Sequence, residues 1–340
     1  MKRFGNLYEK TFTVDALYDA FLKTRAGKRQ NVACFRMERR LGGALQELHD
    51  ELMSDTYTPR PFYSFMVHEP KTREIQAPAF RDGVVQHAIY RTINPIFDAT
   101  FCRDSFACRV GKGTHRASER ARKFMRTSGP DDYYVEMDIR KFFPSINHDI
   151  LYGLLVRKIK DRRLLRVMRT FFGDSGRGLP IGYLLSQIYA NIYLNEVDQY
   201  CKRHMEMPRY VRYMDNFACI GISSLARARA ILESVRGFVD RKLDMALSKF
   251  TIQKIRKGFN FVGYRTWQSK KFIRKYSLYN FSRALRDGRL DSVVSILGHA
   301  RHSRSLGYLL TMAKEKNNVL YHQIPESIRR LHHAPAADTA

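Results

Sequence analysis

The sequence predicts an α+β fold, in which long helices accompany strands that pair as hairpins. Strand-like apolar residues flank the polar turn Tyr213-Met214-Asp215-Asn216, which is the pattern of a β-hairpin with an acidic tip. A second strand-like stretch, residues 133–138, ends on Asp138. Helical spacing appears near the amino terminus, where four leucines form one apolar face: Leu41, Leu45, Leu48 and Leu52.

Composition predicts a polyanionic partner. The 340 residues include 60 Lys and Arg against 33 Asp and Glu, a formal net charge of +27 at pH 7, which favours binding to nucleic acid. An anionic membrane is the alternative polyanion. However, no apolar run approaches the roughly 18 residues of a membrane span, and the first residues do not form a signal-peptide pattern. We therefore expect a cytoplasmic protein without a membrane partner.

The cysteines predict a reduced protein. They are five in number, and no two of them form a Cys-x-x-Cys pair. An odd count without that pair favours free thiols and argues against a structural zinc site.

The first third of the chain is predicted to be helical, with one strand-turn-strand inside it. Residues 14–53 have helical spacing, and residues 63–67 alternate like a strand. A turn carrying Lys71 and Arg73 follows. The next helix is expected to end near Pro95, because proline interrupts helical hydrogen bonding.

Three stretches together indicate one active site. Residues 133–138 end on Asp138, residues 178–187 form a Gly-Pro loop leading into a helix, and Asp215 lies at the hairpin tip. An Asp in an isolated hairpin is ordinarily a turn former. In this order, however, the stretches resemble the catalytic motifs of reverse transcriptases, ending with their Tyr-x-Asp-Asp hairpin. The resemblance implies two divalent ions that bridge a 3′-oxygen and a triphosphate, and such ions need carboxylates from separate strands at one point.

The resemblance covers roughly residues 35–300 and implies a right-hand polymerase. Such an enzyme has fingers, a palm with an antiparallel sheet and an RRM-like core, and a helical thumb. The amino-terminal extension and fingers would occupy residues 1–132 together with about 147–177. The palm would occupy residues 133–265, and the thumb and tail residues 266–340.

The resemblance also implies the catalytic residues Asp138, Asp215 and Asn216. Two Mg²⁺ ions, for which Mn²⁺ can substitute, would be held by Asp138, the Ile139 carbonyl and Asp215. Asn216 stands where the family has a second Asp. Because its amide carries no charge, we expect it to hold metal more weakly and to attenuate activity.

Seven residues are implied to contact the incoming deoxynucleotide. Arg73 is expected to grip phosphate oxygens, although a solvated charged turn is the alternative for this segment. Phe143, five residues after Asp138, would crowd a ribose 2′-hydroxyl. The full set is Lys71, Arg73, Phe143, Ile181, Gly182, Gln187 and Lys249.

Five further residues are implied to contact template or primer. Two of them lie in a Gly-rich basic loop that lacks P-loop spacing, and two lie in residues 258–265, which resemble the primer-grip strand. The set is Arg109, Lys112, Tyr213, Gly263 and Tyr264.

The loop Ile181-Gly182-x-x-x-Ser186-Gln187 resembles that of reverse transcriptases from diversity-generating retroelements, to which antiviral-defence reverse transcriptases are closely related. This implies a structured non-coding template RNA, dNTPs, a cDNA product, and a small accessory protein or a second reverse-transcriptase subunit. Ile181 replaces a side chain that would hydrogen-bond the nucleotide, which predicts weak discrimination. Because Asn216 departs from the family pattern, a catalytically silent RNA-binding subunit remains the alternative.

Overall fold

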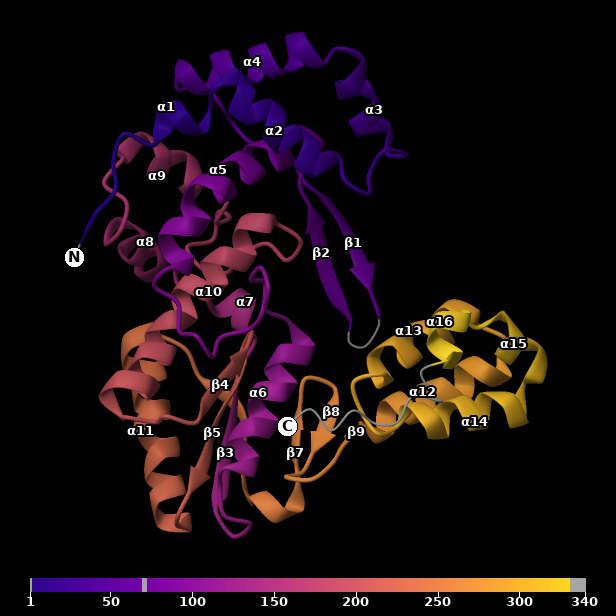
Figure 1. Cartoon of the computed structure of the whole chain (residues 1–340). Helices are drawn as coiled ribbons and strands as arrows, with labels where there is room; N and C mark the ends of the chain where they lie inside the picture. Colours follow the sequence, from indigo (N-terminus) through magenta and orange to yellow (C-terminus); the bar gives the residue numbers. More distant parts are fainter. Residues whose placement is uncertain (1, 69–71, 331–340) are drawn as a thin grey trace.

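The computed structural model describes residues 2–68 and 72–330, and its elements form three neighbouring groups (Figure 1). Amino-terminal helices and a long hairpin make up the first group. A four-stranded sheet with its covering helices makes up the second, and a three-stranded sheet with a helical bundle the third. Helices mixed with antiparallel sheets confirm the predicted α+β class.

The central sheet is antiparallel throughout and has the strand order β4-β5-β3-β6. One long helix, α10 (Leu184–Gln199), separates β3 from β4 in the chain, and another, α11 (Leu225–Leu243), separates β5 from β6. This β-α-β-β-α-β order is the ferredoxin-like arrangement, which confirms the predicted RRM-like core. The strands are β3 (Tyr133–Ile139), β4 (Tyr210–Tyr213), β5 (Asn216–Ile222) and β6 (Leu247–Lys254).

Side chains alternate along β3, so that one face of the sheet packs on the main core and the other carries the partly buried acids Glu136 and Asp138. Val135, Met137 and Ile139 are at most 2% exposed and belong to the main apolar core. Tyr134, on the other face, packs against residues of helix α6 (Thr114–Arg126). Glu136 and Asp138 follow on that same face and are only partly buried.

The predicted helical region at the amino terminus is divided into four helices. These are α1 (Tyr8–Thr11), α2 (Val14–Arg25), α3 (Val32–Arg39) and α4 (Leu41–Met53). Three of the four leucines of the predicted stripe, Leu45, Leu48 and Leu52, are at most 2% exposed, as expected for a core face. Strands β1 (Tyr63–Val67) and β2 (Arg73–Ala77) then pair as an antiparallel hairpin that extends away from these helices (Figure 1).

Pro95 does not end its helix, and this prediction was wrong. Helix α5 runs from Phe80 to Asp98 with Pro95 inside it. Proline there removes one backbone donor, but Ile93 and Phe97 on either side are at most 2% exposed. The burial of apolar side chains in this last turn therefore outweighs the free-energy cost of the missing backbone hydrogen bond.

Short helices connect β3 with β4. They are α7 (Phe142–Ser145), α8 (His148–Val156), α9 (Arg162–Arg169) and, after α10, a π-helical turn at Tyr200–His204. A 3₁₀ turn at Ile255–Lys257 then leads from β6 to the small sheet.

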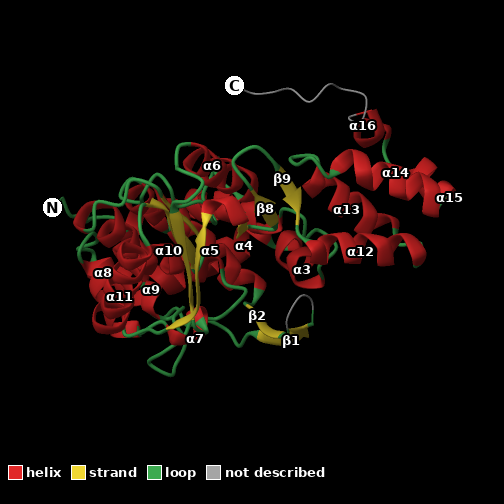
Figure 2. Cartoon of the chain, turned by 90° about the horizontal axis from the view of Figure 1, so that it is seen from below, coloured by secondary structure: helices red, strands yellow, loops and turns green. Residues whose placement is uncertain are grey.

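The third group begins with the small sheet and ends in a helical bundle (Figure 2). Val293, Leu297, Leu309 and Leu310 are at most 1% exposed and share one apolar cluster, so the predicted bundle is confirmed. Its elements are β7 (Phe259–Phe261), β8 (Tyr264–Thr266), β9 (Lys271–Ile273), α12 (Lys275–Arg286), α13 (Leu290–Ala300), α14 (Leu306–Lys316), α15 (Asn318–Gln323) and α16 (Glu326–Arg329). The domain boundaries at residues 133 and 266 stay predictions.

All five cysteines are free thiols in this fold, which agrees with the expectation of a reduced protein. Within residues 2–68 and 72–330, no helix has the length and apolar character needed to cross a bilayer.

Candidate active site

Asp138 is flanked by strands on both sides near the end of β3. It pairs across the sheet with Asn216 on β5 and with Lys249 on β6. Ser248 Oγ donates to Asp138 Oδ1 at 2.8 Å and also lies 3.2 Å from the Asp138 carbonyl oxygen. The carboxylate is therefore oriented by a neighbouring hydroxyl rather than left to rotate.

The turn that carries Asp215 is tied to both the sheet and the core. Met214 has a φ of 54°, a left-handed conformation that is uncommon for a residue other than glycine. The fully buried Arg212 donates through one NH group to the Met214 carbonyl at 3.1 Å and grips both Asp198 oxygens at 2.7 Å. In addition, the Ile139 N–H donates to the Asp215 carbonyl at 3.3 Å. The turn is thus held beside the end of β3.

Asn216 makes its side-chain hydrogen bond with an acid rather than with a base. Its Nδ2 donates to Glu136 Oε1 at 2.9 Å. Burial raises the pKa of the Glu136 carboxyl, and the hydrogen bond from Asn216 acts in the opposite direction. The Asn216 Oδ1 atom is buried and has no hydrogen-bond partner among the described residues.

The donor chemistry here fits a divalent cation. Asp138, Asp215 and the Ile139 carbonyl offer hard oxygen ligands, which Mg²⁺ and Mn²⁺ prefer. The orphaned Oδ1 of Asn216 is an oxygen of the same kind. Across the described part of the chain, no cluster of three or more His, Cys, Asp or Glu side chains is arranged to hold a metal. Strand pairing and a backbone hydrogen bond place residues 138 and 215 at the same end of the sheet.

Comparison with known proteins agrees with this geometry. Residues 68–266, more than half of the chain, match the family described as Reverse transcriptase (RNA-dependent DNA polymerase). This chain belongs to the reverse transcriptase family.

Its relatives include bacterial and intron-encoded members. Protein YkfC of Escherichia coli is 28% identical over 298 residues, which cover 73% of this chain and 76% of YkfC. The Group II intron-encoded protein LtrA of Lactococcus lactis is 28% identical over 169 residues, or 46% of this chain. The match spans only 28% of LtrA.

A solved structure supports the fold of this reverse transcriptase. Telomerase from Candida albicans, determined with a fragment of telomeric RNA, superimposes with a TM-score of 0.50 at 10% sequence identity. The match covers 82% of this chain and 61% of that one. At this identity the likeness concerns the fold alone, and it confirms the right-hand polymerase architecture.

The loop of residues 178–187, which is predicted to contact the nucleotide, lies against the β1–β2 hairpin. The Gln76 N–H donates to the Ile181 carbonyl at 2.7 Å. Gly182 has a φ of +122°, and a Cβ built there would lie 2.6 Å from the Gln76 carbonyl oxygen. Glycine is therefore required both by backbone conformation and by the close approach of β2.

Gly182→Ala is expected to push the loop and hairpin apart. We expect the KM for dNTPs to rise about tenfold and stability to fall by about 1–3 kcal/mol, because positive φ and a backbone clash act together. Steady-state kinetics and thermal unfolding measure both effects. Gly176→Ala is the matched control, since Gly176 has a φ of +70° but nothing within 4 Å of its added Cβ. Equal effects of the two substitutions would show that the contact with β2 is unimportant.

The other predicted nucleotide contacts are mostly accessible. Arg73 on β2, Gln187 on α10 and Lys249 on β6 are exposed, and Lys249 lies directly across from Asp138. Lys71 lies outside the described residues. Phe143 is partly buried, packs edge-to-face on Phe142 at 5.4 Å, and accepts a backbone hydrogen bond from the 178–187 loop. Their roles at the nucleotide stay predictions.

The nucleic-acid role of Arg109 stays a prediction, and in this structure its side chain is engaged within the protein. The side chain is only 7% exposed, and its guanidinium is committed to Asp98 at 2.6 Å and to the Cys102 and Ser105 carbonyls. These contacts stabilise the loop between α5 and α6. Lys112 is partly exposed, and its Nζ donates to the Arg103 carbonyl at 2.7 Å.

The nucleic-acid role of Tyr264 likewise stays a prediction, and in this structure the residue makes contacts within the protein. It is fully buried, and its hydroxyl is engaged with the His299 carbonyl at 2.8 Å and with His115 Nδ1 at 2.9 Å. Tyr264 thereby joins α6 to α13. Gly263 packs so closely on the His299 ring that an added Cβ would lie 2.8 Å from Nε2. Tyr213 is partly exposed near Thr114, with 3.3 Å between the hydroxyls.

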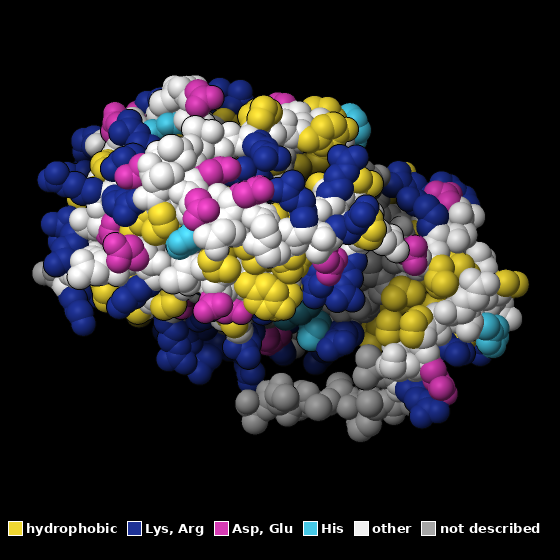
Figure 3. All heavy atoms as spheres, turned by 90° about the horizontal axis from the view of Figure 1, so that it is seen from above, with side chains coloured by type: hydrophobic (Ala, Val, Ile, Leu, Met, Phe, Trp, Pro, Cys, Tyr) yellow, Lys and Arg dark blue, Asp and Glu magenta, His cyan; other side chains and the backbone are white. Residues whose placement is uncertain are grey.

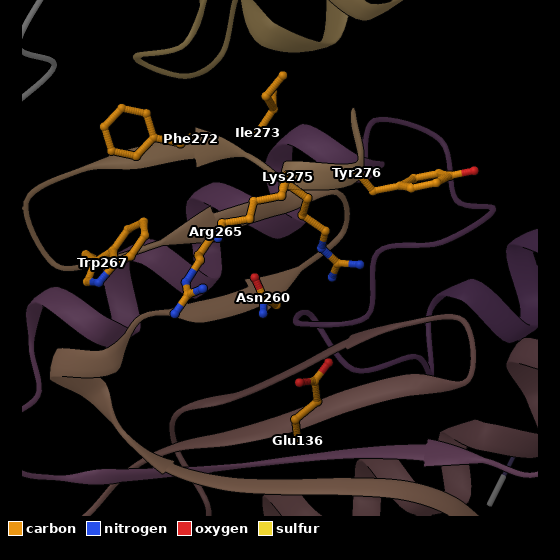
Figure 4. Close-up of a pocket in the computed structure, with 9 residues that line it drawn as sticks. Glu136, Asn260, Arg265, Trp267, Phe272, Ile273, Lys275 and Tyr276 are labelled. Carbon is orange, nitrogen blue, oxygen red and sulfur yellow. The ribbon is translucent and has the colours of Figure 1, made fainter. Parts of the chain in front are cut away.

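Sequence reasoning assigned no role to three residues that the structure brings to the site: Ser248, Arg212 and Glu136. An arginine inside the apolar strand before the acidic turn was the one available signal for Arg212. Glu136 lies at one wall of a cavity of about 770 Å³, facing residues of the small sheet (Figure 4). Trp267, Phe272 and Tyr276 give that cavity an aromatic lining, and Arg265, Arg274 and Lys275 give it positive charge.

The surface carries the charge that composition implies. In Figure 3, Lys and Arg side chains are spread widely over the face shown, with acidic groups between them. The positive charge is therefore not confined to one cleft.

Proposed function

We propose that this chain is an active RNA-directed DNA polymerase with Asp138 and Asp215 as its catalytic acids. The observation that carries the proposal is the joining of these acids at one end of the sheet. Asp138 pairs with Asn216, and the Asp215 carbonyl accepts from the Ile139 N–H. In a chain of the reverse transcriptase family, this is the arrangement that nucleotidyl transfer needs.

Asp138, Asp215 and the Ile139 carbonyl would hold two divalent ions, Mg²⁺ or Mn²⁺, which when bound activate the 3′-hydroxyl and offset triphosphate charge. The chain's own residues prepare the site. Ser248 orients Asp138, and Arg212 holds the turn that presents Asp215. Lys249 and the exposed Arg73 offer cations for phosphate oxygens.

The test is primer extension on an RNA template with dNTPs and either metal. Synthesis of cDNA that requires RNA template, dNTPs and divalent metal is the expected result. A purified chain that binds RNA yet extends no primer with Mg²⁺ or Mn²⁺ contradicts the proposal. RNA affinity itself should fall steeply with salt, because a net charge of +27 releases counterions on binding.

Phe143→Ala is expected to relax sugar selection. If the partly buried ring crowds a 2′-hydroxyl, its removal should lower the preference for dNTPs over rNTPs by about 10–100-fold. The ratio of kcat/KM for the two sugars measures this. Phe142→Leu is the control, because Phe142 is 3% exposed in the core and should change stability without changing the ratio. An unaltered ratio in Phe143→Ala would assign that ring to the core as well.

We further propose that the template is a structured non-coding RNA of a diversity-generating retroelement or an antiphage defence system. The Ile181-Gly182 loop and the similarity to intron-encoded proteins support an RNA-dedicated enzyme. Sequencing the nucleic acid that co-purifies from the native cell tests this setting. One abundant RNA with matching cDNA is expected, with mutations at template adenines in the retroelement case. Random cellular RNA without cDNA would contradict the proposed setting.

One observation favours a second candidate, a catalytically silent RNA-binding subunit. The amide of Asn216 is engaged with Glu136, in a position where the family has an acid. This candidate predicts tight RNA binding without extension by the isolated chain under any metal. Extension that depends on Asp138 excludes it.

A further inference from the structure

The two ends of the Asn216 amide differ in their surroundings. Nδ2 donates to Glu136 Oε1 at 2.9 Å. Oδ1 is buried without a hydrogen-bond partner among the residues that the structure describes. Leaving a buried amide oxygen without a hydrogen bond is energetically unfavourable. A neighbouring group must therefore impose this orientation of the Asn216 amide.

Glu136 supplies the cause. A carboxylate accepts hydrogen bonds but does not donate them, so only the NH₂ end of an amide can face it. Glu136 reaches Asn216 because it lies two residues before Asp138 on the same face of β3, diagonal to Asn216 across the strand pair. On its other side Glu136 faces the cavity of Figure 4, where the cation of Arg274 attracts it.

We propose that Glu136 is a positioning residue that fixes the Asn216 amide so that Oδ1 is presented as a neutral oxygen ligand opposite Asp138. Partners that orient a metal ligand in this way commonly decide its metal affinity. The inference rests on the proposed function, because the cation to be bound is the one that polymerase chemistry requires.

The same contact accounts for an amide at position 216. An Asp there would set a second carboxylate against Glu136 at hydrogen-bond distance, and like charges in a partly buried site repel. The acid at 216 therefore becomes favourable only when residue 136 is made neutral. Glu136→Gln would supply an NH₂ group to the new carboxylate and exchange the donor and acceptor roles.

The experiment compares the parent, Asn216→Asp, Glu136→Gln and the double variant. Thermal unfolding without metal at pH 8 reports the pair itself. Mn²⁺ binding followed by electron paramagnetic resonance, without nucleic acid, reports the ligand, and primer extension reports activity. Glu233→Gln controls for loss of one negative charge, because Glu233 is 62% exposed in a surface pair with Arg236 on α11.

We expect Asn216→Asp to lower the metal-free Tm by about 3 °C or more and the double variant to recover it to within about 1 °C. Glu136→Gln should weaken Mn²⁺ binding about tenfold, since its amide no longer forces the orientation of Asn216. The double variant should bind Mn²⁺ at least as tightly as the parent, because a carboxylate replaces the amide.

Several results would overturn the proposal. One is an Asn216→Asp protein that is as stable as the parent, extends faster and gains nothing from Glu136→Gln. Another is Mn²⁺ affinity that Glu136→Gln leaves unchanged. A third outcome is that Asn216→Asp lowers the Tm and the double variant recovers it, while no variant binds Mn²⁺ or extends a primer. In that case the proposed function fails together with the metal-directed role of Glu136. Failure of compensation in proteins that do extend primers overturns this inference alone.

Discussion

Asp138→Asn is expected to reduce the rate of primer extension by about a thousandfold, equivalent to about 4 kcal/mol of transition-state stabilisation. The substitution keeps the size of the side chain and an oxygen that Ser248 Oγ can reach, now 2.8 Å from Asp138 Oδ1. What it removes is the negative charge that a divalent ion requires. Asp215→Asn should behave alike, since both acids are needed at one end of the sheet.

Single-turnover extension and RNA binding should be measured on the same preparations. RNA affinity should change little, because it depends on a net charge of +27, whose Lys and Arg side chains are spread widely over the face shown in Figure 3. Asp131→Asn is a suitable control, because Asp131 precedes the other end of β3 and is 64% exposed in a pair with Lys254. Extension by Asp138→Asn at more than a tenth of the parent rate would contradict its assignment as a metal ligand.

Arg212→Met is expected to destabilise the protein by about 3–5 kcal/mol, because it leaves the carboxylate of Asp198 buried without its cation. Both side chains are fully buried, with Arg212 Nε 2.7 Å from Asp198 Oδ1. The Tyr210 hydroxyl would still donate to Asp198 at 2.7 Å, but a neutral donor does not replace a bidentate guanidinium. The Met214 carbonyl would also lose its donor, so extension should weaken in the folded fraction.

Urea denaturation monitored by circular dichroism measures the stability change. The double variant Arg212→Met/Asp198→Leu should recover part of the loss, because an apolar pair leaves no buried charge. Arg236→Met removes an exposed pair with Glu233 and should stay within about 0.5 kcal/mol of the parent. A loss below about 1 kcal/mol in Arg212→Met would mean that water or another group solvates Asp198.

Local patterns in the sequence were sufficient to predict the elements that carry Asp138 and Asp215. The predicted strand before Asp138 and the hairpin around Asp215 are β3 and the β4–β5 pair. Turn residues, β-branched and aromatic residues and helical spacing act over a few neighbours, so a linear reading detects them.

Contacts between segments that are distant in the sequence decided the features that local patterns did not predict. Arg109 and Tyr264 lie in basic or glycine-rich segments of the sequence, and only the fold brings them to Asp98 and His115. Helix α5 continues past Pro95 because the burial of Phe97 in the core stabilises the additional turn.

The sequence alone predicted the α+β fold class, through local periodicity and turn residues, and it places the acids Asp138 and Asp215 in motifs whose order resembles that of reverse transcriptases. Tertiary structure alone decided which atoms those acids meet. Asn216 reads as a missing carboxylate, but its meaning depends on Glu136, which lies 80 positions earlier in the chain. A hydrogen bond and the repulsion of like charges depend on distance in space, which sheet pairing sets and a linear pattern does not contain.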